Sequence, residues 1–169
     1  EDLPGSGESL IINSDTTFTV DAGETVVSDA RITLQGLGDT VPEFKIINKG
    51  DLTINGNVNC ISAKLTIQND GALALQDFSV RLDGNSTLTV DNGETLKIEG
   101  VSVQVYGGYF YVSNDGTLTS QNLYIKDQFD GTLISNSGEC IFSETTLVAN
   151  GAHGKIEVFN SGDMQIHQG

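Results

Sequence analysis

The residues best placed to do chemistry lie in one short acidic segment. Asp127 and Asp130 stand beside Lys126 in "KDQFDG". An enzyme that cleaves polysaccharides needs two carboxyl groups at a defined separation across a groove. Nothing near these residues fixes such a separation, and both flank a turn, so we interpret them as solvated turn residues. The sequence predicts no catalytic residue and no enzyme, and a carbohydrate-active enzyme stays as the third hypothesis.

The residues that commonly bind metal ions are scattered. His153 and His167 have no metal-ligand spacing with each other or with a cysteine, so we expect both at the surface. Cys60 and Cys140 are the only cysteines, too few for a disulfide framework. Cys140 reads as a buried thiol, and the two are too far apart along the repeat described below to pair within one chain.

What organises the chain is a repeat. "VSNDGTLTS" recurs in altered form with an Asn followed by Gly one or two residues later, and the Asn residues are separated by 21, 23, 22, 22 and 24 residues. They are Asn48, Asn69, Asn92, Asn114, Asn136 and Asn160. Upstream, "TFTVDAGETV" matches "TLTVDNGETL", which puts Ala22 in the Asn position. The step from there to Asn48 is longer, and "GLGDTVPE" at 36–43 predicts an inserted loop.

Around each Asn the apolar residues alternate with polar ones. They occupy the second and fourth positions before it, the fourth and sixth after it, and a third pair follows, as in Val101 and Val103. A period of two indicates strands with one buried face, and no 3.6-residue period is sustained, so we expect almost no helix. Three short strands per ~22 residues predict an all-β protein, a parallel β-solenoid of about seven coils. A β-sandwich is the alternative, but a sandwich has no reason to keep one turn at a fixed period.

The coil length and the Asn column resemble the right-handed parallel β-helix superfamily, which includes pectate lyases and many surface adhesins. The resemblance covers residues 9–169 and concerns architecture, not a catalytic motif. It implies a right-handed parallel β-solenoid.

The Asn–Gly corner is interpreted as structural. Counting by twos, each Asn points inward, where stacked side chains form a ladder. We expect a left-handed backbone here, with the Gly supplying positive φ. Asn122 lies outside the column and is expected to tolerate substitution. Each corner also carries an acid: Glu24, Asp51, Asp70, Glu94, Asp115, Glu139 and Asp163. We interpret this row as a solvated edge that discourages sideways aggregation. No cofactor is expected, and Ca²⁺ is the alternative for the acidic row.

Charge and composition bound the partners and the location. A net charge of −15 with only eight basic residues argues against nucleic acid or an anionic membrane as partner. No apolar run approaches the ~20 residues of a membrane-spanning helix. The chain begins with Glu1, which fits a secreted protein after removal of a signal peptide, so we expect an extracellular location. Asn85 begins the sequon Asn-Ser-Thr in a turn and is the glycosylation candidate.

The two ends of the chain suggest a function. We expect one domain, 1–169, with an extension at 1–8 and a strand within 9–15 that places Leu10 and Ile12 inward and Ile11 between them. That strand fits a third strand with no first or second before it. The last coil carries Met164 and Ile166 on its second strand and no third strand follows. The leading hypothesis is a structural subunit of a head-to-tail filament, its partner being itself. The alternative is an adhesin or receptor-binding module of a longer surface or phage-tail protein, with surface glycans as partners.

Overall fold

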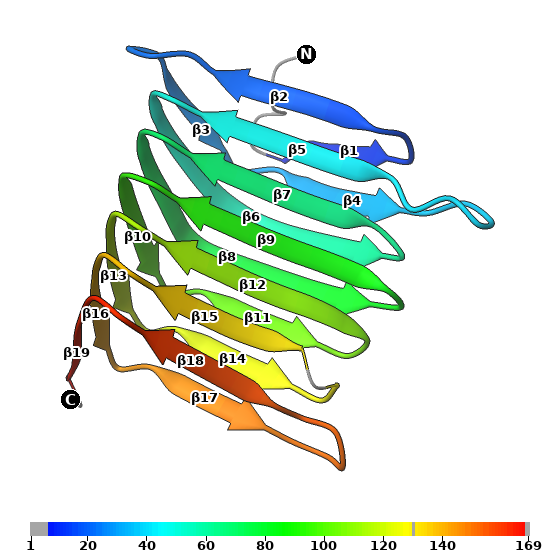
Figure 1. The fold of residues 1–169 in the computed structure, drawn as a ribbon. Coiled ribbons are helices and arrows are strands. Elements are labelled where there is room, and N and C mark those ends of the chain that lie inside the picture. Colours follow the sequence, from blue (N-terminus) through cyan, green and yellow to red (C-terminus); the bar gives the residue numbers. More distant parts are fainter. Residues whose placement is uncertain (1–6, 130, 168–169) are drawn as a thin grey trace.

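The computed structural model describes residues 7–129 and 131–167, and in this part of the chain every regular element is a β-strand. All strand pairs are parallel, and successive coils stack into a solenoid with the N-terminal coil at one end and the C-terminal coil at the other (Figure 1). The prediction of an all-β parallel solenoid with about seven coils of ~22 residues is confirmed. The described residues contain no helix that is long and apolar enough to cross a membrane.

Three columns of strands run along the solenoid, and each complete coil adds one strand to each column (Figure 1). The first-strand column holds β2 (Thr16–Val20), β5 (Glu43–Asn48), β7 (Lys64–Asn69), β9 (Ser86–Asn92), β12 (Gly108–Asn114), β15 (Thr132–Asn136) and β18 (Ile156–Asn160). The second column holds β3 (Thr25–Ser28), the start of β6 (Asp51–Ile61), the start of β8 (Ala72–Asp83), β10 (Thr95–Glu99), β13 (Thr117–Gln121), β16 (Glu139–Ser143) and β19 (Asp163–His167). The third column holds β1 (Ser9–Ile12), β4 (Arg31–Gln35), the ends of β6 and β8, β11 (Ser102–Val105), β14 (Tyr124–Asp127) and β17 (Thr146–Ala149).

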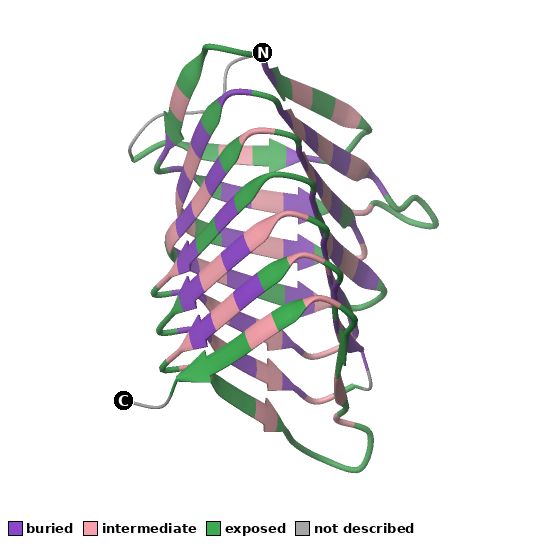
Figure 2. Cartoon of the chain, turned by 60° about the vertical axis from the view of Figure 1, so that its left-hand side comes forward, coloured by how far each residue is buried: buried purple, intermediate pink, exposed green. Residues whose placement is uncertain are grey.

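The core consists of like residues stacked along the axis. In the second column Leu52, Leu73, Leu96, Leu118 and Cys140 lie one above another, all buried. Their outward neighbours alternate with them, so buried and exposed residues form stripes across each strand (Figure 2). Stacking removes these apolar side chains from water, which stabilises the fold by about 25 cal/mol for each Å² of apolar surface that is buried. The predicted third-strand pairs, such as Val101 with Val103, are buried, which confirms that reading.

A loop of residues 36–42 separates β4 from β5 and projects from the side of the solenoid (Figure 1). It begins at Gly36 and carries Leu37 and Val41, both exposed. Residues 1–6 of the predicted N-terminal extension lie outside the described residues.

The predicted register of the first coil is wrong by two residues. Val20, not Ala22, pairs with Asn48, and Val20 is buried while Ala22 is exposed. The carbonyl of Val20 accepts the N–H of Lys49, just as the carbonyl of Asn48 accepts that of Asp70. The cause is a corner with four residues between its strands where the corner after Asn48 has two.

The left-handed backbone also lies at a different corner from the one predicted. No residue at the six Asn corners has positive φ, although Gly23 at the equivalent corner of the first coil does (φ 85°). Between the second and third strands, however, Asp77 (φ 46°), Gly100 (66°), Asn122 (54°) and Glu144 (51°) recur once per coil. Asn122 is therefore a corner residue with a left-handed backbone, and we now expect Asn122→Leu to cost more than its place outside the Asn column predicted, because bulky residues adopt this conformation at a cost.

Candidate assembly interface

The six asparagines form one ladder along the corner that follows the first strand. The amide Nδ2 of Asn48 donates to Oδ1 of Asn69 at 2.7 Å, and each later step repeats the bond at 2.6–2.7 Å down to Asn160. From Asn48 to Asn136 each amide also donates to a backbone carbonyl at the start of the next coil's second strand, as Asn114 does to Glu139 at 2.9 Å. The ladder thus ties adjacent coils through side chain and backbone.

Glycine recurs at this corner because the coils approach closely. A Cβ on Gly71, Gly116, Gly138 or Gly162 would lie well inside van der Waals contact of a carbonyl in the preceding coil. At these four positions space, and not positive φ, selects Gly, which corrects the predicted reason, whereas Gly23 of the first coil has the positive φ that was predicted.

Asp127 is not the solvated turn residue that we predicted. It is fully buried and occupies an inward position held by Cys60, Leu82 and Val105 in earlier coils. Its carboxylate accepts hydrogen bonds from the N–H of Phe129 (2.8 Å) and from the Thr132 hydroxyl (2.6 Å). It also accepts the N–H of Gly131 at 3.2 Å. A buried carboxylate with three donors serves to close the turn. Asp130 lies outside the described residues.

The other titratable residues are not brought together. His153 and His167 are both exposed, as predicted. Cys60 and Cys140 are free and buried, and burial raises the pKa of the Cys60 thiol to about 12 and that of Cys140 to about 11. Among the described residues no group of three His, Cys, Asp or Glu side chains is arranged to hold a metal ion, and this includes the acidic row.

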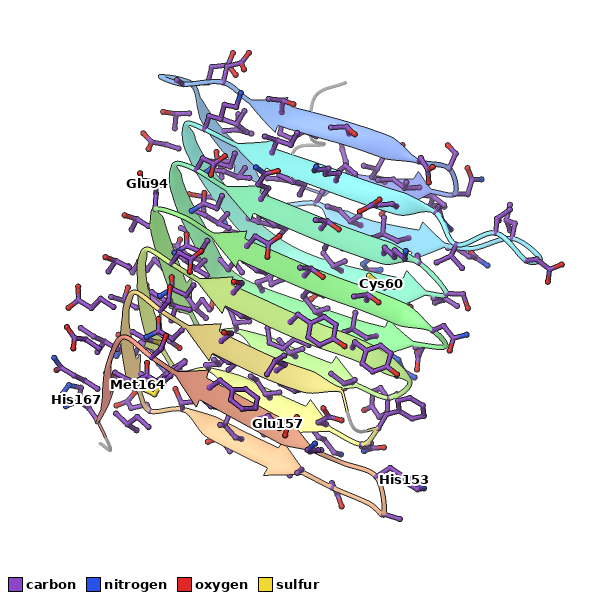
Figure 3. The ribbon with its side chains drawn as sticks, in the orientation of Figure 1. Cys60, Glu94, His153, Glu157, Met164 and His167 are labelled. Carbon is purple, nitrogen blue, oxygen red and sulfur yellow. The ribbon has the colours of Figure 1, made fainter. Side chains whose placement is uncertain are left out.

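Among the described residues, nothing covers the inner side chains of the C-terminal coil. A hollow of about 310 Å³ is lined mainly by apolar side chains, among them Phe142, Leu147, Val158, Met164 and Ile166. The exposed fractions of Leu147, Val158 and Ile166 are 43%, 42% and 68%, although equivalent residues in inner coils are buried. Met164 lies on the last coil near the C-terminal end (Figure 3).

The opposite end begins with β1, which among the described strands pairs only with β4 and lies at the top of the third column. Ile12 is buried, Leu10 is partly buried and Ile11 faces outward with 68% of its surface exposed. The structure therefore places Leu10 and Ile12, but not Ile11, along the inner wall.

The two ends have matching columns. Leu10 and Leu147 are the first and last members of one inward column, as are Phe18 and Val158, and Val26 and Met164. The third column starts one strand earlier than the other two, at β1, and in the described residues it also ends one strand earlier, at β17. An end of this shape can be continued by its opposite end in the same register.

Two further surface features lie away from the ends. Asn85 is exposed in a turn, so the glycosylation candidate is accessible. On β12 the rings of Tyr109 and Tyr111 are stacked at 5.8 Å with an angle of 8° between their planes. Phe129 contacts Tyr109 edge-on at 6.5 Å, and the two residues are 44% and 40% exposed, which makes a small aromatic surface.

No protein-family model, no curated protein and no solved structure matches this chain.

Proposed function

We propose that the protein is a structural subunit of an extracellular filament that assembles head to tail. The first coil of one copy stacks on the last coil of the next, and β1 supplies the third strand that follows β19. The observation that carries the proposal is the match between the columns at the two ends. The proposal includes no catalytic step and no cofactor.

The apolar residues at the ends support this contact. In the joined solenoid Leu10 covers Leu147, Phe18 covers Val158 and Val26 covers Met164, by continuation of the internal registers. Burying side chains of this size contributes on the order of 1–2 kcal/mol each. The free strand edges at both ends gain backbone partners as well. Because the contact is heterologous, it propagates into a filament unless a rotation closes it.

A matched pair of variants on β19 tests the proposal. Ile166→Asp places a charge in the open end, whereas Gln165→Asp places the same charge on the outer face of the same strand. Both positions are exposed, so both variants should fold. We expect the parent and Gln165→Asp to form filaments in negative-stain micrographs and Ile166→Asp to remain monomeric. Filaments in all three proteins would contradict the proposed interface.

An adhesin or receptor-binding module is the second candidate, and the surface of Tyr109, Tyr111 and Phe129 favours it. Flat aromatic faces with hydroxyl groups suit partners that are part apolar and part polar, such as surface glycans. Two threonines, Thr87 and Thr89, lie beside the tyrosines on the neighbouring strand.

The second candidate has its own test. On a glycan array, an adhesin should give signals that Tyr109→Ala abolishes and that Tyr124→Ala, a change on the third-strand column, leaves intact. Equal binding by the two variants, or none by the parent, would remove the argument for this candidate.

A further inference from the structure

The corner of the first coil differs from the corners below it in how its backbone is satisfied. In inner coils, the N–H of the residue after the Asn position donates to a carbonyl of the coil above, as Ser137 does to Asn114 at 2.8 Å. The corresponding residue in the first coil is Asp21. Its N–H donates instead to the carboxylate of Glu24, at 2.9 Å from Oε2. The side chain of Glu24 thus stands where a backbone carbonyl stands in every lower coil.

We infer that Glu24 is a displaceable cap that regulates the head-to-tail contact. This inference rests on the proposed filament. When a second copy docks, the carbonyl of its Asn160 takes over the N–H of Asp21, and the Glu24 carboxylate swings out into water. The partner is another copy of this chain, recognised by backbone geometry.

The same corner weakens the contact in a second way. Val20 holds the position that Asn holds in the other coils. The amide of Asn160 of the arriving copy therefore meets an apolar side chain, and the junction lacks the Asn–Asn hydrogen bond that ties each internal step from Asn48 onward. Glu24 and Asp21 also approach Asp163 of the other copy, which occupies the same second-strand column position as Thr25. The junction is weaker than the coil-to-coil contacts within a subunit, so the filament comes apart into folded subunits.

A hollow of about 480 Å³ at this corner leaves room for the exchange. It is lined by Phe18 and Val26 from the inner wall and by Asp21 and Glu24 from the corner, among others.

The test compares Glu24→Ala with Glu94→Ala. Glu94 lies at the corresponding corner of an inner coil, where the coil above is already in place (Figure 3). Both variants remove one negative charge from the same edge. By sedimentation, we expect Glu24→Ala to lower the protein concentration at which assemblies appear about ten-fold, since a charge-assisted hydrogen bond no longer competes. Glu94→Ala should leave it nearly unchanged. Equal effects of both changes, or none from Glu24→Ala, would overturn the inference.

A second measurement separates this inference from the proposed function. In dilute monomer, amide hydrogen exchange at Asp21 should accelerate about ten-fold in Glu24→Ala and stay unchanged in Glu94→Ala. No acceleration overturns the cap even if filaments form. If exchange at Asp21 accelerates but the protein never assembles, Glu24 does cap the free edge of the first coil. That result would overturn both the displacement of Glu24 by a second copy and the proposed filament.

Discussion

At the scale of single residues, the ladder asparagines show why one side chain can recur without being a ligand. The side-chain N–H of each Asn that is followed by another coil donates to the Asn of the next coil and to a backbone carbonyl of that coil. Its side-chain oxygen accepts a hydrogen bond from the Asn of the preceding coil, where there is one. An amide placed once per coil therefore satisfies backbone and side chain together. The pattern stops at Val20, where the corner is built differently.

Replacing a central ladder residue should destabilise the fold strongly. In Asn114→Leu the amide of Asn92 loses its side-chain acceptor, and the backbone carbonyl of Glu139 loses a donor. Each buried group left unpaired lowers the free energy of unfolding by roughly 1–3 kcal/mol. We expect the melting temperature to fall by about 10 °C. Asn57→Leu, on the outer face of β6, is the control and should shift it by less than about 2 °C.

Asn122→Leu should fall between these two variants, because its backbone is left-handed while its side chain is exposed. Equal thermal shifts for Asn114→Leu and Asn57→Leu would show that the ladder is not structural.

The buried thiols predict how stability depends on pH. The folded pKa values of Cys60 and Cys140 are raised from 9.0 to about 12 and about 11. Below pH 9 both thiols are protonated in the folded and unfolded chain, so the shift has no effect there. Above pH 9 the unfolded chain loses protons first, and stability falls as the pH rises, by up to ~1.4 kcal/mol per pH unit for each thiol.

Urea denaturation at pH 8 and pH 10 measures this effect. Parent protein should lose more stability over that interval than the variant with Cys60→Ala and Cys140→Ala. An identical loss in both proteins would mean that the thiols are not buried as described.

At the scale of elements, the sequence predicted the strands well but not how the corners are built. Two-residue alternation and the Asn spacing suffice for the columns, because stacking in a solenoid requires like positions to coincide. The register of the first coil could not be predicted from the similarity of "TFTVDAGETV" to "TLTVDNGETL". The first corner contains two extra residues, so the similar letters stand two positions away from the residues that actually pair.

The second corner was missed for a different reason. Asp77, Gly100, Asn122 and Glu144 share a backbone conformation and no residue type, so no column of letters marks it. Asp127 was misread because its donors come from the turn and from β15 beyond it. The only sequence signal for its burial was the two-residue alternation of the strand, which places Asp127 on the same inward face as Ile125.

The strand β1 carries the element-scale prediction for assembly. Ile12→Pro disrupts the pairing of β1 with β4, which holds the strand in the third column, and deleting residues 1–15 removes the strand. We expect either change to give soluble monomers whose circular dichroism keeps the β signal of the remaining coils. Assembly at the parental concentration by both variants would show that β1 takes no part in the junction.

At the scale of the whole molecule, the charge and the ends act in opposite directions. Copies with a net charge of −15 repel one another, while the open apolar end favours contact. In the proposed junction Asp21 and Glu24 of one copy lie near Asp163 of the other, so these charges oppose an axial approach. End-to-end association should therefore grow stronger as salt screens that repulsion.

The most direct test of the account is the molar mass of the intact protein as its concentration is raised, measured by light scattering in physiological salt. End-to-end assembly predicts a weight-average mass that rises continuously above 17.9 kDa, without a plateau at a closed oligomer. A mass that stays at 17.9 kDa up to millimolar concentration would contradict end-to-end assembly and leave the binding module as the better description.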